Sequence, residues 1–590
     1  MKTLLVIILS ILLLSACKDP EKLNVGFAEP DNPEVVETAL WNNVEPGLQI
    51  SFGSVDERYN RDLPPDINYT NSWEGVGWRG EKIHSQFLLW ANADVKDIHW
   101  EASELKDKEG NILSSESVEI RAVRYVLTDE FLTGCGYRDS DTIQAHLVGD
   151  MLEPVNSLNL PAQATRPMWV TFKIPADQTP GVYQGSIKLQ YNSVAEKTLD
   201  ISIRVQDKIL PPPSAWSFHL DLWQNPFAVA RFHKVPLWSQ QHWDLLKPLL
   251  SMLAEAGQKC ITTSIIPAPW GGQTYDPFES MIGWIYNSSG KWDYDYSIFD
   301  QYVQFAMDCG ISKQINCYSM VPWGNQVRYF DEDSSKYVNR VLIPGSEEFE
   351  DFWKPFLYDF RAHLEEMNWL DKTTIALDER GLKEMKSLFS FMEETTPEFK
   401  ITMAGNYYKE INQEIHDFSY NWGHVFESSK EVADERRKNG AITTYYVACG
   451  IPEPNNFSFS PPAESTYESW FAAAMGFDGF LRWAYNSWVE DPLLDTRFRT
   501  WPAGDTYFVY PGPRSSIRFE RLVEGIQDFE KIRILQEESF KSRTPESIKA
   551  LEEIDTFLRK ITTESLNEKT AAQWVNEGKK LLNKFSENGI

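Results

Sequence analysis

Two acidic residues stand side by side where a short apolar segment ends. Residues 373–377 are uncharged and mostly β-prone, and Asp378, Glu379 and Arg380 follow directly. Residues 381–389 carry apolar side chains at helical spacing, so the pattern predicts a buried strand, an acidic turn and a helix. Carboxyl groups at the end of a strand can exchange protons with a bound molecule and can stabilise a developing positive charge.

Strand-like segments alternate with helical ones on both sides of this acidic pair. A typical helical segment is 240–256, with Ser239 as its expected N-cap and Gly257 at its end. Eight such alternations favour a (β/α)8 barrel over 214–535, whose catalytic groups would lie at the carboxyl ends of the strands. A doubly wound open sheet is the alternative, but it usually has fewer strands and a phosphate-binding glycine loop, which does not follow the first strand here. The predicted strands cover 216–223, 260–267, 313–320, 373–379, 400–405, 418–422, 442–449 and 477–483.

The segment before the barrel has the period-two pattern of β-strands. Apolar and polar residues alternate at 183–191 and again at 199–205, and the turn signal 179–181 comes just before them. Strands with one polar face fit antiparallel sheets packed as a sandwich, which we place at 22–210. The prolines 211–213 form a stiff linker to the barrel. Residues 536–590 are mostly helical and are expected to form a C-terminal extension.

Residues 1–17 have the pattern of a targeting segment rather than of a folded element. Lys2 precedes an apolar run, and 14–17 resemble the lipobox of bacterial lipoproteins, in which the cysteine, here Cys17, carries the lipid. An ordinary secretory signal with a chance cysteine is the alternative. We therefore expect a bacterial cell-envelope lipoprotein tethered to the outer membrane through Cys17, on its periplasmic or surface-exposed face.

Charge and cysteine usage exclude several classes of partner. With 86 acidic and 57 basic residues the net charge is -29, so nucleic acid is not expected to bind. The cysteines after Cys17 are odd in number and lack the spacing of a disulfide framework or a zinc site. We expect them to be small core residues, and we expect no metal and no cofactor. They are Cys135, Cys260, Cys309, Cys317 and Cys449.

The predicted strand ends collect aromatic rings, amides and carboxylates. Such a mixture suits a sugar, whose C–H faces stack on rings while its hydroxyl groups bind amides and acids. Core packing is an equally good explanation for any single tryptophan, but tryptophan recurs at five of the eight strand ends. The substrate-binding residues that we predict are Asp221, Trp223, Trp270, Asn406, Tyr407, Asn421, Trp422, Tyr445, Trp483, Tyr485 and Trp488.

The adjacency of Asp378 and Glu379 bears on the mechanism. A usual retaining glycosidase places two carboxyl groups about 5–5.5 Å apart across the sugar. Neighbours on one strand point to opposite sides, so this pair is not expected to flank one bond in that way. The seventh predicted strand offers no second carboxylate, and the nearest is Glu453. The nucleophile would then be the 2-acetamido group of the substrate, with Glu379 as general acid/base and Asp378 stabilising the oxazolinium ion. Asp221, Asp417, Glu427 and Glu453 stay open as alternative nucleophiles.

Several motifs along the chain resemble those of glycoside hydrolase family 123. They are the segments 77–81, 221–231, 504–507 and 515–521, together with the Asp378-Glu379 pair. The resemblance runs from the predicted sandwich through the barrel. It implies β-N-acetylgalactosaminidase activity by substrate assistance, with Asp378 and Glu379 as the catalytic pair.

These observations together predict an exo-acting, retaining glycosidase that removes terminal β-linked N-acetylgalactosamine from glycans or glycolipids. One alternative keeps the mechanism but changes the sugar to N-acetylglucosamine or a sulfated hexosamine. Another is a glycan-binding lipoprotein without activity, although a binding protein would have no need of an acid beside the bond.

Overall fold

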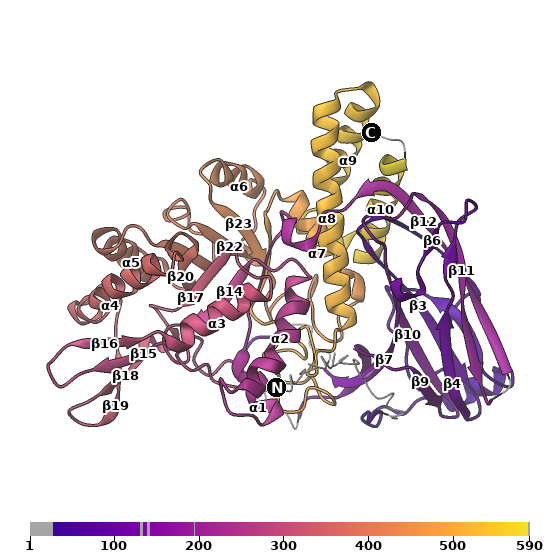
Figure 1. The fold of residues 1–590 in the computed structure, drawn as a ribbon, viewed down its shortest axis with the longest axis horizontal. Helices are drawn as coiled ribbons and strands as arrows, with labels where there is room; N and C mark the ends of the chain where they lie inside the picture. The colour runs from indigo at the N-terminus through magenta and orange to yellow at the C-terminus, as the bar shows by residue number, and fades with distance from the viewer. Residues whose placement is uncertain (1–26, 130–133, 138–141, 194, 588–590) are drawn as a thin grey trace, which may run out of the picture.

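The computed structural model describes residues 27–129, 134–137, 142–193 and 195–587, which form a β-sandwich, a barrel and a set of C-terminal helices (Figure 1). The predicted leader and Cys17 lie outside the described residues. Within those ranges, no helix has both the length and the apolar character needed to span a bilayer.

The N-terminal region is a sandwich of two sheets, as the alternating pattern predicts. Leu199, Ile201 and Ile203 are buried between the sheets, whereas Asp200 and Arg204 on the same strand face solvent. The first sheet has the order β1 (Gln49–Gly53), β3 (Lys82–Ala91), β10 (Ala164–Lys173), β7 (Val118–Thr128) and β8 (His146–Glu153). The second has the order β2 (Ser72–Arg79), β12 (Ala195–Ile209), β11 (Gly181–Tyr191), β4 (Val95–Ala102) and β9 (Ser157–Leu160), with β5 (Leu105–Lys106) and β6 (Ile112–Leu113) beside it.

The central region is a parallel eight-stranded barrel, which confirms the predicted (β/α)8 fold. An isolated parallel bridge between Leu220 and Gln258 joins the two ends of the sheet. In sheet order the strands are β13 (His219–Leu222), β24 (Gly479–Arg482), β23 (Ile442–Tyr446), β22 (Asp417–Asn421), β21 (Lys400–Gly405), β20 (Thr373–Asp378), β17 (Gln314–Tyr318) and β14 (Cys260–Ser264). The helices between or after these strands are α1 (Pro226–His233) and α2 (Gln240–Ala254), which both precede β14, and α3 (Ser297–Asp308), α4 (Glu347–Glu366), α5 (Leu382–Thr395), α6 (Ser429–Lys438), α7 (Pro462–Ala474) and α8 (Ile517–Ser542).

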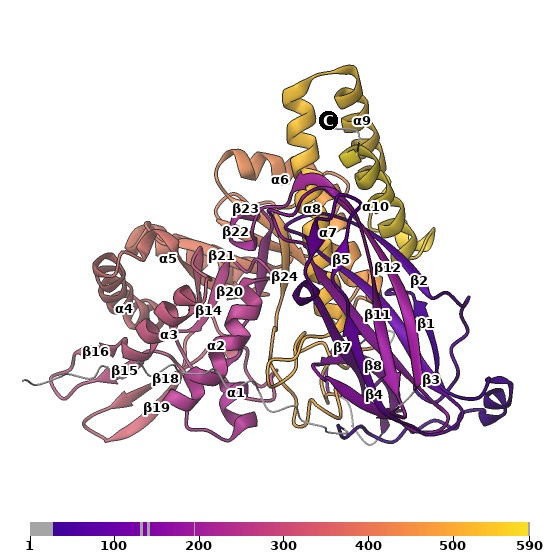
Figure 2. The same cartoon turned by 45° about the vertical axis from the view of Figure 1, so that its right-hand side comes forward.

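Two additions extend the barrel. A four-stranded sheet lies on the side of the barrel away from the sandwich in both views (Figure 1, Figure 2). Its strands are β16 (Trp292–Asp295), β15 (Gly283–Tyr286), β18 (Gln326–Asp331) and β19 (Lys336–Val341), and Trp284 stacks on Phe352 of α4. At the other end, α9 (Pro545–Leu558) and α10 (Ala571–Glu587) form the predicted helical tail, packed against α7 and α8.

Helix α8 lies between the barrel and the sandwich and carries buried ion pairs to the sandwich (Figure 1). Arg518 of α8 binds Asp150 at 2.9 Å, and both side chains are inaccessible to solvent. The indole of Trp78 in the sandwich donates to Ser586 of α10 at 2.9 Å. The segments 77–81 and 515–521 are therefore the two sides of this interface. The other ion pairs across it include Arg121–Glu520, Arg521–Asp56 and Lys531–Glu81.

A disulfide joins the two domains between Cys135 and Cys449, which are 314 residues apart in sequence. We predicted both as unpaired core residues, and that prediction is wrong. Sequence spacing carries no information about two loops that meet only after both domains fold. Cys260 and Cys317 are free and buried, as predicted, while Cys309 is free and half-buried.

Candidate active site

A cavity of about 550 Å³ opens at the carboxyl ends of the barrel strands. Asp378 and Glu379 line it, together with a third carboxylate, Asp505. Tryptophan and tyrosine rings supply much of the remaining wall, and Cys135 brings the sandwich domain into it. The aromatic residues that line the cavity are Trp223, Trp323, Tyr446, Trp483 and Trp501.

The backbone at Glu379 explains how two neighbouring carboxylates face one cavity. Asp378 is the last residue of β20, and Glu379 follows with a left-handed φ of 45°. Its N–H still donates to the carbonyl oxygen of Ala404 on β21 at 2.8 Å. The left-handed residue interrupts the strand alternation that we had expected to separate the two side chains, and this corrects that expectation. A non-glycine residue in such a conformation costs roughly 1–3 kcal/mol, a strain that is typical of functional sites.

Asp378 is held by a tryptophan and an arginine. The indole Nε1 of Trp323 donates to its Oδ2 at 2.9 Å. Arg380 stacks over the Trp323 ring, 4.4 Å from its centroid, and its Nε donates to the Asp378 carbonyl oxygen at 2.6 Å. Burial, and after it the charge of Glu379, raises the pKa of Asp378 to about 7. The Asp378 carboxyl therefore gives up its proton only as pH rises through about 7.

Glu379 accepts a hydrogen bond from the seventh strand. The hydroxyl of Tyr446 donates to Glu379 Oε1 at 2.5 Å, and Asn421 Nδ2 donates to the same hydroxyl oxygen at 3.1 Å. Burial and the neighbouring Glu379 carboxylate raise the pKa of Tyr446 well above its usual value, so the hydroxyl keeps its proton. This chain of hydrogen bonds fixes the position of Glu379 in the cavity.

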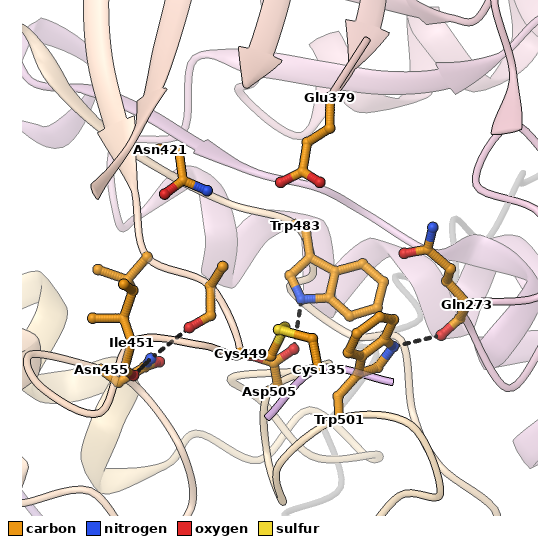
Figure 3. The surroundings of a disulfide bond; sticks show 12 residues. Cys135, Gln273, Glu379, Asn421, Cys449, Ile451, Asn455, Trp483, Trp501 and Asp505 are labelled. Carbon is orange, nitrogen blue, oxygen red and sulfur yellow. Dashed lines mark hydrogen bonds between the residues drawn. A yellow bond between two sulfur atoms is a disulfide. The ribbon is translucent and has the colours of Figure 1, made fainter. Parts of the chain in front are cut away.

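Asp505 is already engaged by other side chains. Arg482 Nη2 binds its Oδ1 at 2.6 Å, and the indole Nε1 of Trp483 donates to its Oδ2 at 2.9 Å (Figure 3). Arg482 and Asp505 are almost completely buried. Because both carboxylate oxygens accept strong bonds, Asp505 orients Trp483 rather than reacting with a sugar.

The wall opposite Glu379 is built jointly by both domains (Figure 3). Trp501 meets Trp483 edge to face at a centroid distance of 5.8 Å, and its Nε1 donates to the carbonyl oxygen of Gln273 at 2.9 Å. Beside Trp501, the N–H of Gly136 in the sandwich segment donates to the Thr500 carbonyl oxygen at 3.1 Å. The Cys135–Cys449 disulfide ties the same segment to the loop after β23. The sandwich thus contributes to the wall of the cavity.

The structure brings five of the predicted residues together at this cavity: Trp223, Asp378, Glu379, Asn421 and Trp483. Asp221 does not line it. It lies buried inside the barrel, where Asn316 Nδ2 donates to its Oδ2 at 3.0 Å. Burial, and after it the charge of Asp417, raises the pKa of Asp221 to about 7. Its place outside the cavity lining gives no support to the prediction that it binds substrate, which stays a prediction.

Seven further predicted residues also lie outside the cavity lining, so their part in substrate binding stays a prediction. Trp270 packs behind Trp223, with ring centroids 5.0 Å apart. Tyr485 and Trp488 are fully buried, and both donate to backbone carbonyl oxygens. A position near a strand end does not decide which way a side chain points, and these rings pack in the hydrophobic core. The others are Asn406, Tyr407, which packs on Tyr420, and Trp422 and Tyr445, which pack on each other.

Several lining residues were not among the predicted ones. Tyr446 follows the predicted Tyr445 in the sequence. Because neighbouring side chains on a strand point to opposite faces, Tyr446 was the alternative candidate for the side that faces the cavity. Trp323 follows the third predicted strand, so its place in the sequence was already a signal. Asp505, Trp501 and Gln273 come from loops without periodicity, although Asp505 belongs to the family-like segment 504–507.

A pair of carboxyl groups set among aromatic rings at the carboxyl ends of the strands of a (β/α)8 barrel fits an enzyme that cleaves glycosidic bonds. Comparison with known proteins gives the family. Residues 223–535 match the family model described as "Glycoside hydrolase 123, catalytic domain", and 52–191 match "Glycoside hydrolase 123 N-terminal domain". The chain belongs to glycoside hydrolase family 123, and its substrate is a carbohydrate.

A solved structure supports the same assignment. The family 123 glycoside hydrolase from Clostridium perfringens, studied for glycolipid glycan hydrolysis, is 27% identical, with a TM-score of 0.84 over 92% of this chain and all of that one. A family 5 xyloglucanase from Bacteroides ovatus is 8% identical over 81% of this chain and all of that one, with a TM-score of 0.26 that supports no inference. No curated protein sequence matches the chain.

Proposed function

We propose that this glycoside hydrolase removes terminal β-linked N-acetylgalactosamine from glycans or glycolipids, with retention of configuration and with the 2-acetamido group of the substrate as nucleophile. The observation that carries the proposal is the placement of Asp378 and Glu379 side by side in one cavity whose third carboxylate is ion-paired. The similar enzyme from Clostridium perfringens, studied for glycolipid glycan hydrolysis, supports the substrate class.

In the first step, the acetamido carbonyl oxygen bonds to the anomeric carbon as the glycosidic C–O bond breaks. Glu379 gives its proton to the departing oxygen. Asp378 accepts a hydrogen bond from the acetamido N–H and stabilises the positive charge of the oxazolinium ion. In the second step, Glu379 takes a proton from water, which attacks the anomeric carbon and opens the oxazolinium ring.

The raised pKa of Asp378 bears on this division of roles. A hydrogen bond from the substrate N–H favours the ionised form of Asp378, because donors stabilise a carboxylate. Substrate binding would thus favour the charged form that stabilises the oxazolinium ion.

The alternative nucleophiles are poorly placed. Asp221 and Asp417 are buried below the cavity, and neither lines it. Glu427 and Glu453 are exposed and do not line it either. Among the described residues, the cavity therefore offers no carboxylate besides Asp378, Glu379 and the ion-paired Asp505. A cavity of this size suits a terminal sugar better than the middle of a long chain, which favours exo action.

The test compares two variants on two kinds of substrate. Glu379→Gln should slow N-acetylgalactosaminides with poor leaving groups far more than activated aryl glycosides, which leave without a proton. Asp378→Asn should slow both kinds. Glu453→Gln, which changes an exposed carboxylate outside the cavity, is the matched control and should leave both rates unchanged.

Two further measurements test the origin of the nucleophile. A thiazoline analogue of the cyclised intermediate should inhibit the wild type strongly and Asp378→Asn poorly. The matching galactoside, with a 2-hydroxyl in place of the acetamido group, should barely react. Hydrolysis of both sugars at equal rates would place the nucleophile on the protein. Faster hydrolysis of N-acetylglucosaminides or sulfated hexosaminides would keep the mechanism and change the sugar.

We also propose that the mature protein is a cell-envelope lipoprotein anchored through Cys17. The Cys135–Cys449 disulfide supports this, because such bonds persist in oxidising compartments outside the cytosol. Cys17→Ser should move the protein from the membrane fraction to the soluble fraction with its activity intact. A Cys17→Ser protein that stays with the membranes and incorporates a labelled fatty acid would contradict the proposal.

A further inference from the structure

A second cavity, of about 310 Å³, lies at the opposite end of the barrel from Asp378 and Glu379. Its lining includes residues at or just before the first positions of four neighbouring strands. Each of these strands, β14, β17, β20 and β21, brings a lysine to this edge of the sheet. The four lysines are Lys259, Lys313, Lys372 and Lys400, and all of them line the cavity.

Lys259 is the central observation. Its side chain is only 6% exposed, yet its ammonium group has no hydrogen-bond or ion-pair partner among the described residues. Burial lowers its pKa, the charge of Glu530 acts in the opposite direction, and the charge of Lys313 has a smaller effect that lowers the pKa further. A lysine whose stem is buried while its ammonium group is open to a cavity can offer that charge to a bound ligand.

The other charges around the cavity do not neutralise this cluster. Asp371 is the one carboxylate among its lining residues, and only its backbone carbonyl oxygen accepts a bond from Lys400, at 2.8 Å. Glu530 is already occupied by the N–H groups of Ser217 and Phe218 and by the Ser217 hydroxyl. In a protein with a net charge of -29, this is a strong local excess of positive charge.

A cation site is the competing interpretation of the same region. His219, which lines the cavity, lies with Cys260 and Asp417 so that their ligand atoms are within 4.8 Å of one another. His219 Nε2 and Asp417 Oδ2 are 3.0 Å apart, and Gln314 Nε2 donates to the same oxygen at 2.7 Å. These groups already satisfy one another, and four ammonium groups nearby disfavour a metal ion. The region is therefore suited to an anion.

We propose that this basic cavity at the amino-terminal end of the barrel binds a small oxyanion with at least two negative charges, of the phosphate or sulfate class. Lys259 would bind the anion at the bottom of the cavity, and Lys313, Lys372 and Lys400 would surround it. The anion would be either a free ion or the charged group of a sugar ester. The site is separate from the catalytic cavity and does not depend on the reaction proposed above.

The test is calorimetric titration of the full-length protein at constant ionic strength in chloride buffer, with inorganic sulfate, inorganic pyrophosphate and galactose 6-sulfate as probes. Lys259→Gln and Lys313→Gln should each weaken binding about tenfold or more, since each removes a charge-assisted contact. Lys188→Gln, an exposed lysine on β11 of the sandwich, is the matched control and should bind like the wild type. Glu379→Gln should also bind like the wild type.

The possible outcomes distinguish a free anion from a sugar ester, and they include results that would refute the proposal. Binding of an inorganic probe supports a free ion, and binding of the sugar sulfate alone supports an ester. Lys313 is exposed, so its variant is expected to fold even where Lys259→Gln does not. The proposal is overturned if no probe binds the wild type, or if Lys313→Gln and a folded Lys259→Gln bind as tightly as the wild type does.

Discussion

The hydroxyl of Tyr446 offers a sharp test of how Glu379 is positioned. Tyr446→Phe removes one oxygen atom and leaves the ring in place. That oxygen donates to Glu379 Oε1 at 2.5 Å and accepts from Asn421 Nδ2 at 3.1 Å. Without it, the Glu379 carboxyl loses its protein donor from the seventh strand and is free to turn away from the leaving group.

The size of the effect follows from the type of bond. A hydrogen bond to a charged group contributes about 1.5–3 kcal/mol. With a tenfold change in rate for each ~1.4 kcal/mol, Tyr446→Phe should lower kcat about 10- to 150-fold. The assay is steady-state hydrolysis of an N-acetylgalactosaminide with a poor leaving group. The loss should be much smaller on an activated aryl glycoside, because that substrate needs no proton.

Tyr445→Phe on the same strand is the matched control. The Tyr445 hydroxyl donates to the Glu468 carbonyl oxygen at 2.7 Å, outside the catalytic cavity. Its removal should cost about 1 kcal/mol of unfolding free energy and leave kcat unchanged. If both variants lower kcat equally, or if Tyr446→Phe keeps full activity on the poor substrate, the role given to Tyr446 is refuted.

Three other predictions follow from the site and its walls. Because Asp378 stabilises the oxazolinium ion as a carboxylate and its pKa is about 7, kcat/KM should rise as pH increases through about 7 in the wild type; a pH–rate profile of Asp378→Asn that keeps this limb would contradict the assignment. Reduction of the Cys135–Cys449 disulfide should raise KM with little unfolding, as measured by steady-state kinetics with and without a dithiol. The KM of a variant with serine at both positions should not change when the dithiol is added. Arg482→Met should lower the free energy of unfolding in urea by about 3–5 kcal/mol, because it leaves Asp505 buried without its ion-pair partner. The double variant with Asp505→Leu should recover part of that loss. Equal stability of Arg482→Met and the wild type would refute a stabilising role for this ion pair.

The fold was predictable because its signals are local. Alternation with a period of two marks β12, and apolar helical spacing marks α2, so the order of elements follows from short windows of sequence. The position of Asp378 at a strand end follows from the same pattern. The four-stranded sheet beside α4 was less accessible, because an insertion does not follow the periodicity of the barrel.

The site was predictable only in part, for physical reasons that differ from residue to residue. The left-handed backbone at Glu379 depends on tertiary contacts, so strand alternation gave the wrong relation between the two carboxylates. Strand β23 is buried on both faces, and neither Tyr445 nor Tyr446 stands out by polarity. The Cys135–Cys449 bond and the place of Asp505 depend on how distant loops meet.

The ion pairs between α8 and the sandwich bear on how such proteins diversify. Arg518 on the barrel side would be a buried charge without its carboxylate partner if the sandwich were replaced, whereas Asp150 would keep Arg58 of its own domain at 3.2 Å. Breaking one such pair costs about 3–5 kcal/mol, a large share of the stability of an ordinary domain. Gene fusions that exchange one domain alone would therefore be selected against, and the sandwich and the barrel should be inherited as a single unit.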